Sequence, residues 1–193
     1  NLLREQGKFF NGSEEKDAIH VLVSDLQNLA LAWNYIAGHS DIYMLQQIIQ
    51  PFSALCVNRG YYRGGLALFE SAIAKLDALR PEHQLALGNL YITKAKFLYF
   101  LAQYDQAVLE AEKGLSLVEA SEQPDSIAVV RGLNEVARNS LSLGETRKAI
   151  SNFEQAAMFL EERGDFHRLA EVRGNLVVCL STLGEYEKAE AIA

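Results

Sequence analysis

Proline, cysteine and long apolar runs are all scarce in this chain of 193 residues. With 3 prolines and 13 glycines it has little material for flexible linkers, and 49% of its residues are hydrophobic, so we expect order almost throughout. No apolar run approaches the roughly 18 residues that cross a bilayer, and no signal-peptide pattern opens the chain. These absences predict a cytoplasmic protein without a membrane partner.

The usual motifs of catalysis are also missing. No Gly-x-x-x-x-Gly-Lys-Ser/Thr loop is present, so no nucleotide cofactor is expected here, and adjacent carboxylates such as Glu161 and Glu162 diverge around a helix. The histidines lack the spacing of metal ligands, which predicts no metal site; they are His20, His39, His83 and His167. We therefore expect a protein that is not an enzyme, although a Cys–His pair that meets only in space is left open.

Charge and cysteine content argue against nucleic-acid binding and against a disulfide. The net charge is -7 and the isoelectric point about 5.2, and no basic stripe with interleaved aromatic residues appears, so direct nucleic-acid binding is not expected. Cys56 and Cys179 lie far apart, each between apolar helical residues, and we expect buried free thiols rather than a disulfide.

What the chain does have is an internal repeat. A short turn pattern occurs as Gly144-Glu-Thr-Arg-Lys-Ala149 and Gly184-Glu-Tyr-Glu-Lys-Ala189. Earlier variants begin at Ala102 and Gly60, which gives spacings of 42, 42 and 40 residues. A period between about 20 and 50 residues is typical of a solenoid, in which each unit buries its apolar face against its neighbours.

Apolar residues follow helical spacing, and strand-like alternation is absent. Several residues mark helix boundaries: a glycine stop at Gly38, candidate caps at Ser40 and Asp41, and prolines near helix starts at Pro81 and Pro124. Pro51 predicts a kink near Gln47. The helices are expected at about 14–37, 42–58, 62–79, 82–101, 104–121, 125–143, 146–163, 166–183 and from about 186 onward.

Stacking the copies aligns Leu101, Leu143 and Leu183 before the turn and a small residue five positions after its start, at Gly65, Ala107, Ala149 and Ala189. This pattern resembles the tetratricopeptide (TPR) repeat, in a form longer than the usual 34 or so residues. The resemblance implies an all-α, right-handed superhelix of antiparallel helix pairs with a period of 40–42 residues. We expect one domain over 1–193, with a helical cap at 1–41 and repeats at 42–193, the last one truncated.

A narrower resemblance lies near the N-terminal end. Asp25, Asn28, Ala32 and Trp33 follow one another along a predicted helix, and Gly60 and Phe69-Glu-Ser-Ala72 come later. This run is similar to the start of the helical sensor region of STAND-class bacterial signalling ATPases, a group that includes transcription regulators. Gly64 departs from that pattern, which usually has an acidic residue there. The resemblance implies a sensor or scaffold within a larger protein, and we expect the chain to be a piece of one.

In TPR arrays the first helix of each pair lines the concave face. The last three such helices here carry a net charge of about +2 in sum, whereas the second-type helices at 104–122 and 145–165 carry about -4 and -2. Amides can bind an extended peptide backbone, and arginine can fork onto a carboxylate or phosphate. By helical spacing the predicted concave-face residues are Gln47, Gln50, Asn89, Lys96, Tyr99, Arg131, Asn134, Arg138, Glu171 and Asn175.

The sequence thus favours a recognition module for a protein or peptide of acidic character, or for a small effector. A concave face that is only solvated, or is covered by other domains of the parent chain, is the alternative for that surface. A stand-alone adaptor for partner peptides is the alternative for the whole protein, and an enzyme with its site in the groove is a third.

Overall fold

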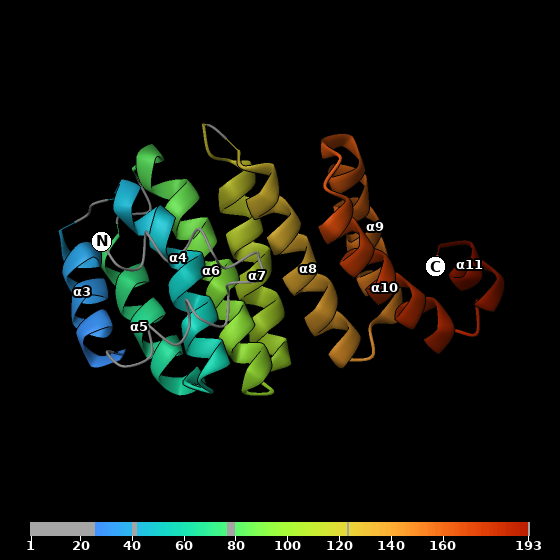
Figure 1. Ribbon diagram of the computed structural model, residues 1–193, viewed down its shortest axis with the longest axis horizontal. Helices are drawn as coiled ribbons and strands as arrows, with labels where there is room; N and C mark the ends of the chain where they lie inside the picture. Colours follow the sequence, from blue (N-terminus) through green and yellow to red (C-terminus); the bar gives the residue numbers. More distant parts are fainter. Residues whose placement is uncertain (1–25, 40–41, 77–79, 123, 193) are drawn as a thin grey trace.

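A computed structural model describes residues 26–39, 42–76, 80–122 and 124–192. Within these ranges the chain forms nine α-helices and no strand, and Figure 1 shows the array spread along its long axis, with α3 at one end and α11 at the other. The helices are α3 (Leu26–Gly38), α4 (Ile42–Asn58), α5 (Tyr62–Lys75), α6 (Pro81–Phe100), α7 (Tyr104–Glu119), α8 (Ser126–Ser142), α9 (Thr146–Arg163), α10 (Phe166–Thr182) and α11 (Tyr186–Ile192). The predicted all-α solenoid of helix pairs is confirmed.

The repeated turn has one backbone geometry in all four copies. Gly60, Ala102, Gly144 and Gly184 take positive φ angles of 64°, 57°, 81° and 76°. In each copy the next residue donates its N–H to a carbonyl five positions earlier, as from Gln103 to Leu98 at 2.9 Å. This is a Schellman ending, which satisfies the last carbonyls of one helix and reverses the chain into the next. The turn therefore sets the antiparallel pairing.

Small side chains after each turn let the paired helices come close. Gly65, Ala107, Ala149 and Ala189 are all buried, and a Cβ added at Gly65 would lie 2.6 Å from the Phe97 ring. The larger aromatic residues of the same helices, such as Phe153, fill the space between successive pairs at 1% exposure. Alternating small and bulky positions is how helices interdigitate at native packing density.

Trp33 anchors the core at the α3 end. Its ring is fully buried, lies 4.8 Å from the Phe52 ring and 4.5 Å from the Phe69 ring, and its Nε1–H donates to the Leu68 carbonyl at 3.0 Å. This core cluster extends to Phe97, and a second cluster begins at Ile92 and reaches into α10. The two clusters meet along α6.

Most predicted boundaries agree with the structure, and a few do not. α6 begins at Pro81, and Asp125 directly after Pro124 caps α8 by accepting from the Ile127 N–H at 2.9 Å. α5 was expected to reach 79 but ends at Lys75, where Leu76 turns to extended backbone. Pro51 lies buried within α4, which continues to Asn58. The predicted helical residues 14–25, including Asp25, and the caps at 40–41 lie outside the described ranges.

Candidate functional site

A polar pocket of about 230 Å³ lies on the helices that come first in each pair. Four of these helices contribute to it, α4, α6, α8 and α10, so its walls belong to successive repeats. This placement makes it part of the inner surface of the array. The lining residues are Gln50, Ile92, Thr93, Lys96, Arg131, Asn134, Glu135, Arg138, Glu171 and Asn175.

Arg138 is held between a carboxylate and an aromatic ring. Its Nη2 donates to Glu135 Oε2 at 2.5 Å, one helical turn away, and its guanidinium carbon lies 4.1 Å from the centre of the Tyr99 ring. Stacking on a ring face and pairing with a carboxylate both fix the plane of the guanidinium. Arg138 thus enters the pocket in one orientation.

Arg131 is fixed from the neighbouring repeat. Its Nη2 donates to Asn89 Oδ1 at 2.7 Å, across 42 residues of sequence, and it lies 3.7 Å from Asp125 Oδ2. Asn89 is buried and also donates to the Leu85 carbonyl of its own helix at 3.0 Å. Asn89 therefore lies behind Arg131 and positions it, and does not line the pocket.

Burial shifts the pKa values of two charged groups in the pocket, Lys96 and Glu135. It lowers the pKa of Lys96, an effect that Glu135 opposes and that Arg138 and Arg131 reinforce. It raises the pKa of Glu135, which Arg138 and Lys96 in part counteract. In both groups desolvation disfavours the charged form by more than the neighbouring opposite charges favour it.

Three buried polar atoms of the pocket have no hydrogen-bond partner among the described residues. They are Nε of Arg131, Nε of Arg138 and Oδ1 of Asn134. Since the oxygen and nitrogen of an amide are assigned from their neighbours, Asn134 can offer either a donor or an acceptor here. Unsatisfied buried polar groups are costly and uncommon in folded proteins, and two cationic donors among them suit an anion.

The structure brings seven of the ten predicted concave-face residues into this one pocket, namely Gln50, Lys96, Arg131, Asn134, Arg138, Glu171 and Asn175. The other three lie elsewhere: Asn89 behind Arg131, Tyr99 beneath Arg138, and Gln47 on α4 outside the lining. Whether these side chains bind a ligand stays a prediction.

Ile92, Thr93 and Glu135 line the pocket but were not predicted. Thr93 donates to the carbonyl of Asn89 at 2.7 Å, so its hydroxyl is already used within α6. Glu135 lies on α8, one of the helices expected to line the concave face, but was not among the predicted residues. Its spacing of three residues from Arg138 was the available signal, because side chains at i and i+3 are neighbours on a helix.

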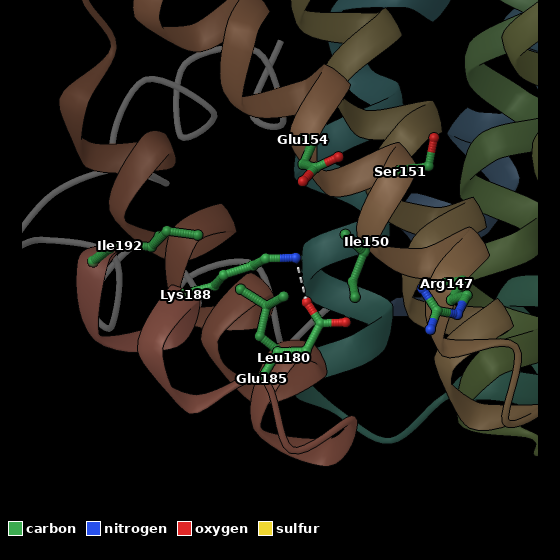
Figure 2. A pocket seen from close by; sticks show the side chains of 9 residues that line it. Arg147, Ile150, Ser151, Glu154, Leu180, Glu185, Lys188 and Ile192 are labelled. Atoms are coloured by element: carbon green, nitrogen blue, oxygen red, sulfur yellow. Dashed lines mark hydrogen bonds and ion pairs between the residues drawn. The ribbon is translucent and has the colours of Figure 1, made fainter.

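Two larger pockets lie at the α11 end. One, of about 390 Å³, lies between α9 and α11, where Lys188 Nζ lies 2.6 Å from Glu185 Oε2. Figure 2 shows this pair beside the aliphatic Ile150 and Leu180. The other, of about 440 Å³, runs along α10 and is mainly apolar. Neither has unpartnered buried polar atoms among its described lining residues. We therefore favour the smaller pocket as the functional site.

Among the described residues, the remaining reactive groups form no second site. Cys56 and Cys179 are free and fully buried in different core clusters, and burial raises the pKa of the Cys56 thiol to about 12. A thiol with a raised pKa is a poor nucleophile. Across the described ranges no three potential metal ligands gather, and no helix there is long and apolar enough to cross a bilayer.

Comparison with solved structures places this fold in a class. The crystal structure of BtubC (BKLC) from P. vanneervenii superposes with a TM-score of 0.73 at 19% identity, over 91% of this chain and 70% of that one. The nearly identical TPR-like repeats of a protein from Podosopora anserina, assigned as a kinesin light chain, give 0.68 at 14% identity, over 98% and 90%. No family model and no curated protein matches the chain. At these identities the likeness concerns the fold: the chain is a TPR-like helical solenoid.

Proposed function

We propose that this chain is a recognition module that binds an acidic peptide or a small acidic effector in the pocket of its inner helices. One observation carries the proposal: Lys96, Arg131 and Arg138 converge on a pocket in which the Nε atoms of both arginines lack partners. Buried cationic donors that the protein leaves unsatisfied are suited to a carboxylate or phosphate, which arginine binds with strong, charge-assisted hydrogen bonds.

The surroundings of these cations fit a peptide. Gln50, Asn134 and Asn175 lie on three different inner helices and supply amides that can pair with a peptide backbone. A volume of about 230 Å³ holds an anchoring side chain, and the remaining peptide would run along the inner helices. A small acidic effector would need the same cations but not the amides of α4 and α10.

Recognition rather than catalysis accounts for the chemistry present. The lining of the pocket contains no serine, cysteine or histidine, and its mostly buried carboxylate, Glu135, is paired with Arg138. We place the module in the cytoplasm, where free thiols such as Cys56 and Cys179 stay reduced.

We further propose that the module is the sensor or scaffold part of a larger bacterial signalling or transcription regulator. The support is the sequence resemblance around Asn28, Ala32 and Trp33, whose described members lie on α3 at the start of the array. The alternative is a stand-alone adaptor. A nucleotide-binding loop encoded upstream of Asn1 would favour the regulator, and an upstream sequence without one would favour the adaptor.

The test is the double variant Arg131→Gln and Arg138→Gln, which removes two cations but keeps polar side chains. We expect it to lose at least about tenfold in affinity for a fluorescein-labelled hexaglutamate peptide, measured by anisotropy, because each charge-assisted hydrogen bond contributes roughly 1.5–3 kcal/mol. Circular dichroism checks that the helices remain.

The matched control is the double variant Arg63→Gln and Arg147→Gln, which removes two exposed arginines from α5 and α9. It changes the net charge equally, so a loss specific to the pocket leaves the control at wild-type affinity. Equal losses in both double variants would show that only overall charge matters and would reject the site. Arg147 also lines the larger pocket between α9 and α11, so a loss confined to the control would move the site there.

A further inference from the structure

Glu135 lies in the middle of the cationic pocket. Its carboxylate accepts a hydrogen bond from Arg138 Nη2 at 2.5 Å, and its side chain is only 13% exposed. A carboxylate in this place uses one of the donors that an acidic ligand would need. The pocket therefore already holds an anion that belongs to the protein.

The charged residues that line the pocket with Glu135 lie on α6, α8 and α10. Arg138 and Arg131 share its helix α8, Lys96 lies across from it on α6, and α10 contributes Glu171, which is exposed. α4 contributes the uncharged Gln50. Among the described lining residues, Glu135 is thus the mostly buried carboxylate, and the cations opposed to it are Arg138 and Lys96.

We propose that Glu135 is a resident counterion, whose carboxylate occupies the position at Arg138 that the acidic group of the ligand takes on binding. Binding then exchanges one carboxylate for another, and Glu135 decides how strongly an acidic ligand is held. This inference rests on the proposed function of the same pocket. It accounts for a carboxylate in the middle of a cationic pocket, since Arg138 and Lys96 would be destabilising in a partly buried site without an opposed charge.

If a ligand carboxylate replaces Glu135 at Arg138, the affinity for that ligand should depend on pH. At a pH well above its pKa, Glu135 is charged and competes with the ligand; at a pH below it, Glu135 is neutral and leaves Arg138 free. Because burial raises this pKa, the change falls above the ordinary range of a glutamate. Affinity for an acidic ligand should rise as pH falls through that window, until the ligand itself is protonated at a pH of about 4.

The test compares wild type with Glu135→Gln for binding of fluorescein-labelled hexaglutamate, by anisotropy between about pH 5 and 8. We expect Glu135→Gln to bind about tenfold tighter at neutral pH, as for removal of one close competing charge, and to lose most of the pH dependence. The matched control is Glu171→Gln, which removes an exposed carboxylate of the same pocket. We expect about a twofold gain there, with the pH dependence retained.

The outcomes separate the two proposals. If wild type binds hexaglutamate but Glu135→Gln binds equally or more weakly, Glu135 is no competitor and the counterion is rejected while the site stands. If Glu171→Gln tightens binding as much as Glu135→Gln, overall charge explains the gain and the counterion is again rejected. If neither wild type nor Glu135→Gln binds, the proposed function for acidic ligands is rejected, and the counterion with it.

Discussion

Ala102 takes the left-handed backbone conformation that glycine occupies in the three other copies of the turn. Its φ angle is 57°, and it is the non-glycine residue with positive φ in the described ranges. An L-residue there costs roughly 1–2 kcal/mol because Cβ approaches the following carbonyl oxygen. Ala102 therefore keeps the backbone geometry of the other turns, although alanine disfavours a positive φ angle.

Replacing Ala102 by glycine should remove this strain. We expect Ala102→Gly to raise the free energy of unfolding by about 1 kcal/mol, partly offset by the greater freedom of glycine in the unfolded chain. The control is Ala67→Gly, at an exposed site inside α5, which should lower stability by about 1 kcal/mol. Urea denaturation followed by circular dichroism measures both. A loss of stability in Ala102→Gly would show that the left-handed conformation is not strained.

At the residue scale, the sequence could place the site only approximately. Helical spacing put seven predicted residues into one pocket, because side chains three or four positions apart share a helix face. It failed for Asn89 because Arg131, from 42 residues further on, covers it and takes its amide oxygen. It failed for Tyr99 because Arg138 stacks on the ring. Such contacts depend on rotamers and on the stacking of repeats, which spacing does not specify.

At the scale of elements, α6 and α7 approach each other closely where two glycines meet. A Cβ on Gly114 would lie 2.7 Å from the carbonyl oxygen of Gly88, and a Cβ on Gly88 would lie 2.8 Å from that of Gly114. The two backbones thus pack directly against each other. Any side chain there has to push the helices apart.

Gly114→Ala should therefore destabilise the fold. We expect the free energy of unfolding to fall by about 2 kcal/mol, since the clash is with backbone and cannot be relieved by a rotamer change. Gly174→Ala is the matched control, because Gly174 lies within α10 with no atom near its missing Cβ, and alanine there should add about 1 kcal/mol. Urea denaturation shows whether each substitution raises or lowers the free energy of unfolding. A neutral Gly114→Ala would mean that α6 and α7 separate at little cost.

The elements themselves were largely predictable, and for identifiable reasons. Glycine or alanine in a Schellman turn, proline at the first position of α6, and aspartate as the cap of α8 all act locally, so they can be recognised without the fold. The end of α5 was missed because no glycine or proline stands directly after Lys75 and the first one, Pro81, already begins α6. There the helix gives way to extended backbone at Leu76, and the sequence alone carries no strong stop signal.

At the scale of the whole molecule, packing is mainly between neighbours. α4 packs against α3, α5 and α6, whereas α10 packs mainly against α9 and α11. Cys56 belongs to the core cluster around Trp33, and Cys179 to the cluster that extends into α10. An array of this kind behaves almost as a one-dimensional system, in which one end can open while the other stays folded.

The two thiols can report this opening separately. In the single-cysteine variants Cys179→Ala and Cys56→Ala, the remaining thiol reacts with a disulfide reagent only when its cluster opens, because both are fully buried. We expect Cys179 to be labelled at lower urea concentrations than Cys56, since α10 has fewer neighbouring helices. Labelling is followed by absorbance, with circular dichroism under the same conditions. Coincident labelling would show that the array opens as one unit.

The pocket is shared by four successive inner helices, from Gln50 on α4 to Asn175 on α10. Its width is consequently tied to the bend of the array. A ligand that bridges these helices would act as a brace and make the whole array stiffer. Conversely, if the proposed ligand binds there, tension that straightens the array would widen the pocket and release it, so occupancy and mechanical load would be coupled through the same curvature.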